Sequence, residues 1–249
     1  KAATVSNQTL SRENLETLLT AATEPLAFES CDFEGADLSR LALRSATFTN
    51  CNFVDVSFYS TDLSGSVWAQ CRGRQADFEA ATLVDAQFSE CDLNNTKWRR
   101  AKLSSASFKS CKLTGAHFEE VASLGLTFED TLLVGADLRK MSFRKVQLQQ
   151  LDFSEADLSG CDFRDAVFHG GSLRNAHMKL ARFEGADLRE ADLGRGLRRV
   201  LVAGRVAGRR RTEQRKQVVD VLVGERALCR VDLTISVHES HHFSQAVQA

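Results

Sequence analysis

Seven cysteines are the first side chains in this sequence that could bind a metal or form disulfides. Five of them recur every twenty residues: Cys31, Cys51, Cys71, Cys91 and Cys111. No Cys-x-x-Cys pair occurs, whereas a structural zinc site needs four ligands at defined short spacings. The regular spacing therefore favours small, buried, apolar side chains. We expect only Cys229, which lies outside this pattern, to be a reactive thiol.

Histidines contribute to the other group of candidate metal ligands. The cluster lies near the end of the sequence and contains Cys229, His238, Glu239, His241 and His242. It lacks the second pair of ligands that a zinc site needs. His117 and His177 precede inward-facing positions of the repeat described below, so we expect them to face solvent. The sequence therefore predicts neither a metal nor a cofactor.

Aspartates are numerous enough to suggest acid–base catalysis, but their positions are periodic. Eleven of them stand one residue before a Phe or Leu of the repeat: Asp32, Asp37, Asp62, Asp77, Asp92, Asp137, Asp152, Asp157, Asp162, Asp187 and Asp192. A catalytic carboxylate pair needs two distinct environments, whereas a repeated position indicates a structural role. The sequence contains no nucleophile–base group, phosphate loop or dinucleotide fingerprint, so we expect no enzyme activity.

A period of five residues organises the chain from Phe28 to Leu193. Of the 34 positions at this spacing, 15 are Phe, 14 are Leu, two are Trp and one is Met; only Gly73 and Ser123 depart from the pattern. Positions two residues earlier are mostly Ala, Cys or Thr, and the other three positions carry nearly all the charge. A period of five fits neither a helix nor a flat strand. It predicts a solenoid whose inward side chains stack coil upon coil.

The twenty-residue cysteine spacing predicts four five-residue faces per coil. The runs that carry a family resemblance are Ala36-Asp37-Leu38-Ser39, Ala156-Asp157-Leu158-Ser159-Gly160 and Ala186-Asp187-Leu188-Arg189. They resemble the A(D/N)LXX unit of pentapeptide-repeat proteins, and the resemblance covers about 170 of the 249 residues. It implies an all-β fold, a right-handed quadrilateral parallel β-helix. The 34 repeats would make about 8.5 coils, a rod of roughly 40 Å at about 4.8 Å per coil.

The ends of the repeat divide the chain into three predicted parts. Residues 1–25 are an N-terminal arm with a short capping helix over 11–22, which Ser11 starts and which ends before Pro25. Residues 26–193 are the β-helix. Residues 194–249 are an atypical tail with 11 basic and five acidic side chains.

Two elements are predicted inside this tail. Residues 212–228 predict a helix and residues 231–237 a short strand. Family members often end in an element that caps the rod and joins two copies. The tail is either such an element, making a homodimer through the C-terminal end, or an extension or reading-frame product without a role.

The charge balance excludes several partners. The formal net charge is −1, so the chain is not a strongly basic nucleic-acid binder, and no direct nucleic-acid contact is expected. A local basic cluster contains Lys97, Arg99, Arg100, Lys102, Lys109 and Lys112. At a spacing of twenty the charges alternate, as in Glu79, Arg99, Glu119 and Arg139, which predicts ion pairs between coils. No apolar run approaches the roughly 18 residues of a membrane span, and no secretion signal precedes Leu10, so we expect a cytoplasmic protein.

These observations leave two functional hypotheses. The first is a non-enzymatic scaffold that binds an unidentified protein. The second rests on the resemblance: quinolone-resistance members of the family bind DNA gyrase and topoisomerase IV, which implies a rod that mimics DNA and competes with it for these type II topoisomerases. The candidate partner-binding carboxylates in that case are Asp152, Glu155, Asp157, Asp162 and Asp165. Glu155 and Asp165 are the two that the repeat does not require.

Overall fold

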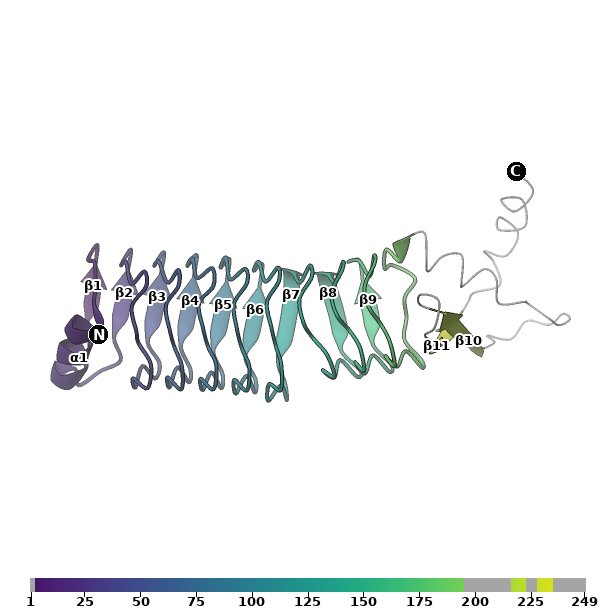
Figure 1. The fold of residues 1–249 in the computed structure, drawn as a ribbon, viewed down its shortest axis with the longest axis horizontal. Helices are drawn as coiled ribbons and strands as arrows, with labels where there is room; N and C mark the ends of the chain where they lie inside the picture. The colour runs from purple at the N-terminus through teal and green to yellow at the C-terminus, as the bar shows by residue number, and fades with distance from the viewer. Residues whose placement is uncertain (1–2, 195–215, 223–227, 235–249) are drawn as a thin grey trace, which may run out of the picture.

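The computed structural model describes residues 3–194, 216–222 and 228–234 and shows a right-handed, four-sided parallel β-helix of about eight turns (Figure 1). We name its faces A to D in chain order. The first inward-facing large residues are Phe28 on face A, Phe33 on face B, Leu38 on face C and Leu43 on face D, and each face repeats every twenty residues. The predicted fold class is confirmed.

The corner residues explain the period of five. Two residues after nearly every inward Phe or Leu of the repeat, the backbone turns through a positive φ, as at Arg40 (59°), Ser45 (56°) and Asp55 (58°). This left-handed conformation is uncommon for residues other than glycine. Because it recurs once in five residues, the chain makes four corners per coil and returns to the same face after twenty residues.

Face A is the most regular part of the fold. Its strands lie in chain order in one nine-stranded parallel sheet (Figure 1): β1 (Thr4–Ser6), β2 (Ala27–Glu29), β3 (Thr47–Thr49), β4 (Val67–Ala69), β5 (Gln87–Ser89), β6 (Ser107–Lys109), β7 (Thr127–Leu132), β8 (Gln147–Asp152) and β9 (Val167–His169). From β2 onward, partners are twenty residues apart, as in Phe28 with Phe48. Faces B, C and D are joined by single parallel bridges at the same spacing, such as Asp37 with Ser57.

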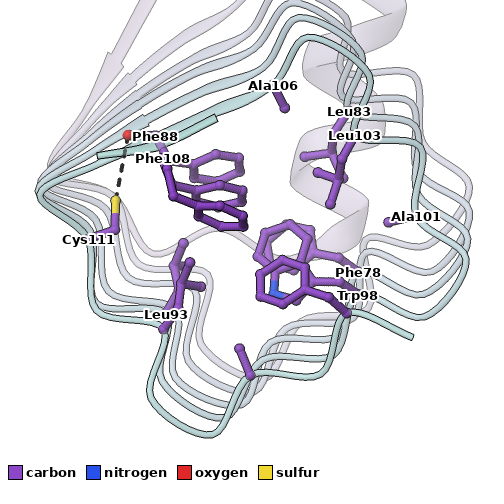
Figure 2. Close-up of a cluster of buried hydrophobic side chains, with 14 of the residues drawn as sticks. Phe78, Leu83, Phe88, Leu93, Trp98, Ala101, Leu103, Ala106, Phe108 and Cys111 are labelled. Atoms are coloured by element: carbon purple, nitrogen blue, oxygen red, sulfur yellow. Dashed lines mark hydrogen bonds between the residues drawn. The ribbon is translucent and has the colours of Figure 1, made fainter. Parts of the chain in front are cut away.

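The interior consists of side-chain stacks that run along the rod. Phe88 and Phe108 stack with ring centroids 4.8 Å apart, and Phe78 stacks on Trp98 at 4.1 Å (Figure 2). Between stacks, Trp98 meets Phe108 edge to face at 5.3 Å. Offset-stacked and edge-to-face pairs are the favourable arrangements of aromatic rings. The predicted inward orientation of both the large and the small columns is confirmed for most of their members.

The N-terminal capping helix is also confirmed. Helix α1 (Arg12–Ala21) begins after Ser11, whose side chain accepts the backbone N–H of Asn14, while the Asn14 side chain accepts the N–H of Ser11 at 2.9 Å. Leu15 is fully buried. Arg12 donates to the backbone carbonyls of Asp37 and Ser39, at 2.9 and 2.8 Å, and so fixes the helix to the first coil.

Strand β1 was not anticipated. Thr4 pairs with Ala27 and Val5 with Phe28, so the pairing is offset by 23 residues instead of twenty. Leu10 is buried, and the neighbouring Thr9 bridges Asp32 with the same offset. The N-terminal arm therefore contributes two inward residues to the solenoid, and its shifted spacing concealed them from a search for a period of five.

The prediction of a helix over residues 212–228 is wrong where the structure describes that segment. Lys216–Leu222 forms strand β10, which pairs antiparallel with β11 (Leu228–Thr234). Val218, Val219 and Val221 are β-branched residues, which favour strands. The strand predicted over 231–237 is confirmed as far as Thr234. The expected cap or dimer element falls largely outside the described residues, as does the cluster of His238, His241 and His242.

No helix in the described ranges is long and apolar enough to cross a membrane.

Replacing Phe108 with Ala tests the stacked core. Phe108 is 1% exposed and lies between Phe88 and Phe128, whose ring centroids are 4.8 and 5.4 Å away. Because in-register neighbours cannot move into the cavity, we expect the free energy of unfolding to fall by about 3–5 kcal/mol. Chemical denaturation measures this loss. Lys109→Ala, at the adjacent outward position, should change stability by less than about 0.5 kcal/mol; equal effects of the two variants would contradict the inward stack.

Candidate functional site

The periodic aspartates form part of the corners. In all eleven, one carboxylate oxygen accepts the backbone N–H of the residue two positions later, for example Ser39 for Asp37 (3.0 Å) and Ser159 for Asp157 (3.0 Å). Such bonds stabilise turns. The structural role predicted for this position is therefore confirmed.

The five candidate partner-binding carboxylates lie around one coil instead of on one face. Asp152 and Glu155 belong to face B, Asp157 to face C, and Asp162 and Asp165 to face D, and the first, third and fourth lie in three separate bridge ladders. The structure therefore brings together at most two of them on any face.

Two of these carboxylates are close to arginine. Asp162 accepts Arg164 at 2.6 Å, and this hydrogen bond lowers the pKa of the carboxyl. Asp157 lies 3.9 Å from Arg139. Glu155 and Asp165 are exposed and make no ion pair with any residue that the structure describes. They are thus the two carboxylates of the set most available to a partner.

Charge pairing between coils is confirmed on face C. Glu119 lies 3.7 Å from Arg99 and 4.0 Å from Arg139, one coil away on either side. Arg139 also contacts Asp137 at 2.7 Å, which lowers the pKa of that carboxyl. Of the predicted basic cluster, Arg99 and Arg100 are paired in this way. Its four lysines have no ion pair among the described residues.

Face A carries a surface that the sequence analysis missed. Of the eight outward side chains of β3 to β6, only Lys109 is charged. The other seven, which we call the uncharged patch, are Thr47, Thr49, Val67, Ala69, Gln87, Ser89 and Ser107. Val67 is 39% exposed. Reading the outward positions at the twenty-residue period would have revealed the patch, because no formal charge occurs at residues 47, 67, 87 and 107.

The cysteine ladder is buried, as predicted. Cys31, Cys51, Cys71, Cys91, Cys111 and Cys161 are free thiols at 2% exposure or less. The Cys111 thiol donates to the Phe88 carbonyl of the preceding coil at 3.5 Å (Figure 2). The hydrogen bond with Cys51, together with burial, raises the pKa of Cys71 to about 12, and burial raises the pKa of Cys161 to about 12. The side chain of Cys229 lies outside the described part of the chain.

Metal binding finds no support within residues 3–194, 216–222 and 228–234, where no three His, Cys, Asp or Glu side chains are grouped so that they could hold an ion.

Comparison with known proteins gives a consistent result. The family model described as a pentapeptide repeat region matches residues 21–98, 42–118 and 101–196. Two solved structures of trypsin-treated variants of QnrB1, a plasmid-mediated fluoroquinolone resistance protein, are 22% identical to this chain, with TM-scores of 0.50 and 0.51. The matched regions cover 66 and 67% of this chain, and 88 and 89% of the two QnrB1 chains. At this identity the likeness concerns the fold alone.

A more distant structure is HetL, a pentapeptide-repeat protein involved in heterocyst differentiation regulation from the cyanobacterium Nostoc sp. strain PCC 7120. It is 19% identical, has a TM-score of 0.40, and covers 76% of this chain and 84% of its own. No curated protein matches the chain by sequence.

Thiol labelling tests the cysteine ladder. Cys51, Cys71, Cys91 and Cys161 are at most 1% exposed, and the pKa of Cys71, Cys91 and Cys161 is about 12. Because a reagent must reach a thiolate to react with it, native protein at pH 8 should leave all four unmodified by iodoacetamide, Cys51 through burial alone. After unfolding in guanidinium, all four should react as ordinary thiols with a pKa of about 8.5. Mass spectrometry of the digested protein locates the modified residues. Native labelling as fast as in the unfolded chain would show that the ladder is open.

Proposed function

The chain belongs to the pentapeptide-repeat family, and from that premise we propose that it is a non-enzymatic scaffold that binds a partner protein through the uncharged patch on face A. The observation that supports this proposal is the absence of formal charge over four successive strands, β3 to β6, apart from Lys109. The centres of protein interfaces are depleted in charged residues, because burying an unpaired charge is costly.

The surroundings of the patch suit the same purpose. Four strands of three residues cover roughly 20 by 10 Å. This area is enough for the centre of a protein interface, and the surrounding residues would supply the rest of it. The corner residues Asn50, Gln70 and Glu90 continue the surface with hydrogen-bonding groups, and Gln70 already donates to Glu90 at 3.1 Å. A polar border around a less polar centre is the usual organisation of a protein interface.

A paired charge insertion tests the patch. In Val67→Lys/Gln87→Glu, the two new charges face each other in register, because Val67 pairs with Gln87. The fold should therefore survive, since opposite charges on neighbouring strands attract, while a desolvated interface should be disrupted. We expect the amount of any partner retained from a lysate of the native host to fall about tenfold, measured by quantitative mass spectrometry.

The matched control is Val84→Lys/Ser104→Glu, which places the same pair twenty residues apart on face D. It should retain the partner at the wild-type level, and thermal melts should confirm that both variants fold. If the face A variant and the control retain the same proteins in equal amounts, the patch is not the binding surface.

The second candidate function is interaction with DNA gyrase or topoisomerase IV as a mimic of DNA. It is supported by the fold shared with QnrB1, a plasmid-mediated fluoroquinolone resistance protein, and by the exposed carboxylates of Glu155 and Asp165. Duplex DNA carries about one negative charge per 1.7 Å of axis. On this hypothesis the unpaired corner carboxylates supply the charges that a DNA-binding groove recognises.

Neutralising these corners tests the mimic. Both residues have positive φ, 61° at Glu155 and 57° at Asp165, and Asn tolerates that conformation. Glu155→Asn/Asp165→Asn should weaken any effect of the protein on gyrase supercoiling, in the presence and absence of ciprofloxacin, by several-fold. Asp55→Asn/Asp85→Asn is the matched control, because these residues occupy the same corners of faces B and D nearer the N-terminus. A wild-type protein without effect on gyrase at any concentration rejects this candidate and leaves the scaffold proposal intact.

A further inference from the structure

The backbone ladder between coils is interrupted between the segments that precede β7 and β8, and the coils are more widely spaced there (Figure 1). Four backbone hydrogen bonds join residues 99–106 to residues 119–126, and four join residues 139–146 to residues 159–166. None joins residues 119–126 to residues 139–146. The N–H groups of Glu120, Ser123 and Gly125 therefore lack the carbonyl partners that Arg100, Leu103 and Ser105 have in the preceding coil.

The local sequence explains the interruption. Ser123 occupies a position that holds Leu or Phe in every other coil of face D, so it leaves the space between Leu103 and Phe143 underfilled. In the adjacent small columns, Val121 is followed by Met141, twenty residues later, and Leu126 by Val146. Bulky residues stacked where Ala usually stacks force neighbouring backbones apart. The coils are thus held apart by the large side chains at residues 121 and 126, while the small side chain of Ser123 between them leaves space unfilled.

The separation produces a cavity of about 200 Å³. Its lining includes Phe118, Val121, Ser123 and Met141, with Glu119, Glu120, Arg139 and Lys140 at its edges. Leu124, the residue after Ser123 in the chain, is 85% exposed. A cavity of this size accommodates an aliphatic or aromatic side chain, and the adjacent N–H groups can bond to the backbone that carries it.

The charges around the cavity are unequal. On the edge formed by residues 139–146, Lys140, Arg144 and Lys145 are exposed and have no ion pair with a described residue. Arg139 is already paired with Asp137 and Asp157 and lies 4.0 Å from Glu119 across the gap. On the opposite edge, Glu119 is paired with Arg99, which leaves Glu120 as the one acidic group there without a described partner. The unpaired charge is therefore predominantly positive and attracts an acidic ligand.

We propose that this interruption, which we call the coil gap, binds an extended acidic segment of a partner protein. The segment adds main-chain hydrogen bonds to the open N–H groups of residues 120–125 and inserts one apolar side chain into the cavity above Ser123. Its carboxylates meet Lys140, Arg144 and Lys145. Addition of an extended peptide to an open backbone edge, with a pocket for a side chain, is an established mode of recognition. The site is on faces C and D and is independent of the uncharged patch.

A peptide array tests the proposal. The probes are immobilised decapeptides that place Leu, Ile, Val, Met or Phe between Asp and Glu residues, with a matched set that has Lys in place of the acidic residues. We expect the labelled full-length protein to bind acidic members and not the Lys set. Ser123→Leu restores the usual residue of the column and fills the cavity, so it should bind the same peptides about tenfold or more weakly while melting no lower than wild type.

Two further measurements separate the parts of the site. Lys140→Gln/Arg144→Gln/Lys145→Gln should lower affinity and its salt dependence, whereas Lys102→Gln/Lys109→Gln/Lys112→Gln, on the preceding coil, should change neither. Amide hydrogen exchange should be faster for Glu120, Ser123 and Gly125 than for Arg100, Leu103 and Ser105, and a bound acidic peptide should slow it. These amides remain measurable whether or not a natural partner is known.

Four outcomes would overturn the proposal. They are the absence of binding by every acidic peptide, equal binding by Ser123→Leu, equal exchange of the two sets of amides, and equal binding of heparin by wild type and Ser123→Leu at the affinity of the best peptide. The last outcome would indicate a general polyanion surface that does not use the cavity.

Discussion

The structure depends on in-register stacking at an interval of twenty residues. A left-handed corner in every five residues makes four faces, and each inward side chain then meets its equivalent one coil away. The strand spacing of about 4.8 Å leaves no freedom in that direction. Aromatic residues therefore stack on aromatic residues, and thiols on thiols. The same constraint gives the aspartates their role, since each one fixes the corner that follows it.

In-register stacking also governs the outer surface. A charge on one coil faces the charge on the next, so like charges in one column would repel. On face C the sequence alternates the sign, and Glu119 lies between Arg99 and Arg139. On face A, from β3 to β6, it avoids charge almost completely. These are two solutions to one electrostatic problem, but only the second leaves a surface that a partner can cover without displacing ion pairs.

The sequence predicted the fold in detail because one rule applied to 34 successive positions. The buried columns, helix α1 and the structural aspartates all follow from that rule or from ordinary capping chemistry. It failed where the rule changes: β1 pairs with an offset of 23 residues, and β10 lies beyond the repeat, in a segment that was predicted to be a helix. The candidate carboxylates were chosen for their proximity in the sequence, but consecutive pentapeptides lie on different faces. The five were therefore dispersed around the rod, and a search column by column would have been needed to find a surface.

Ser123 shows what happens when the five-residue pattern is broken without compensation. A single departure is tolerated where a neighbouring side chain fills the space. At Gly73, Leu93 does so: a Cβ added to Gly73 would lie 2.9 Å from the Leu93 side chain. The backbone hydrogen bonds between coils continue there, since the Gly73 N–H donates to the Asp92 carbonyl. At Ser123 the flanking residues Val121 and Leu126 are too large for their columns, so they oppose the approach that would close the space. Overfilled and underfilled positions side by side cannot both relax, because β7 and β8 remain paired in register and hold the two coils at their usual spacing on face A. The coil gap is thus a consequence of three neighbouring departures from the repeat acting together. Replacing Ser123 alone with Leu would fill the cavity and leave Val121 and Leu126 to hold the backbone edge open.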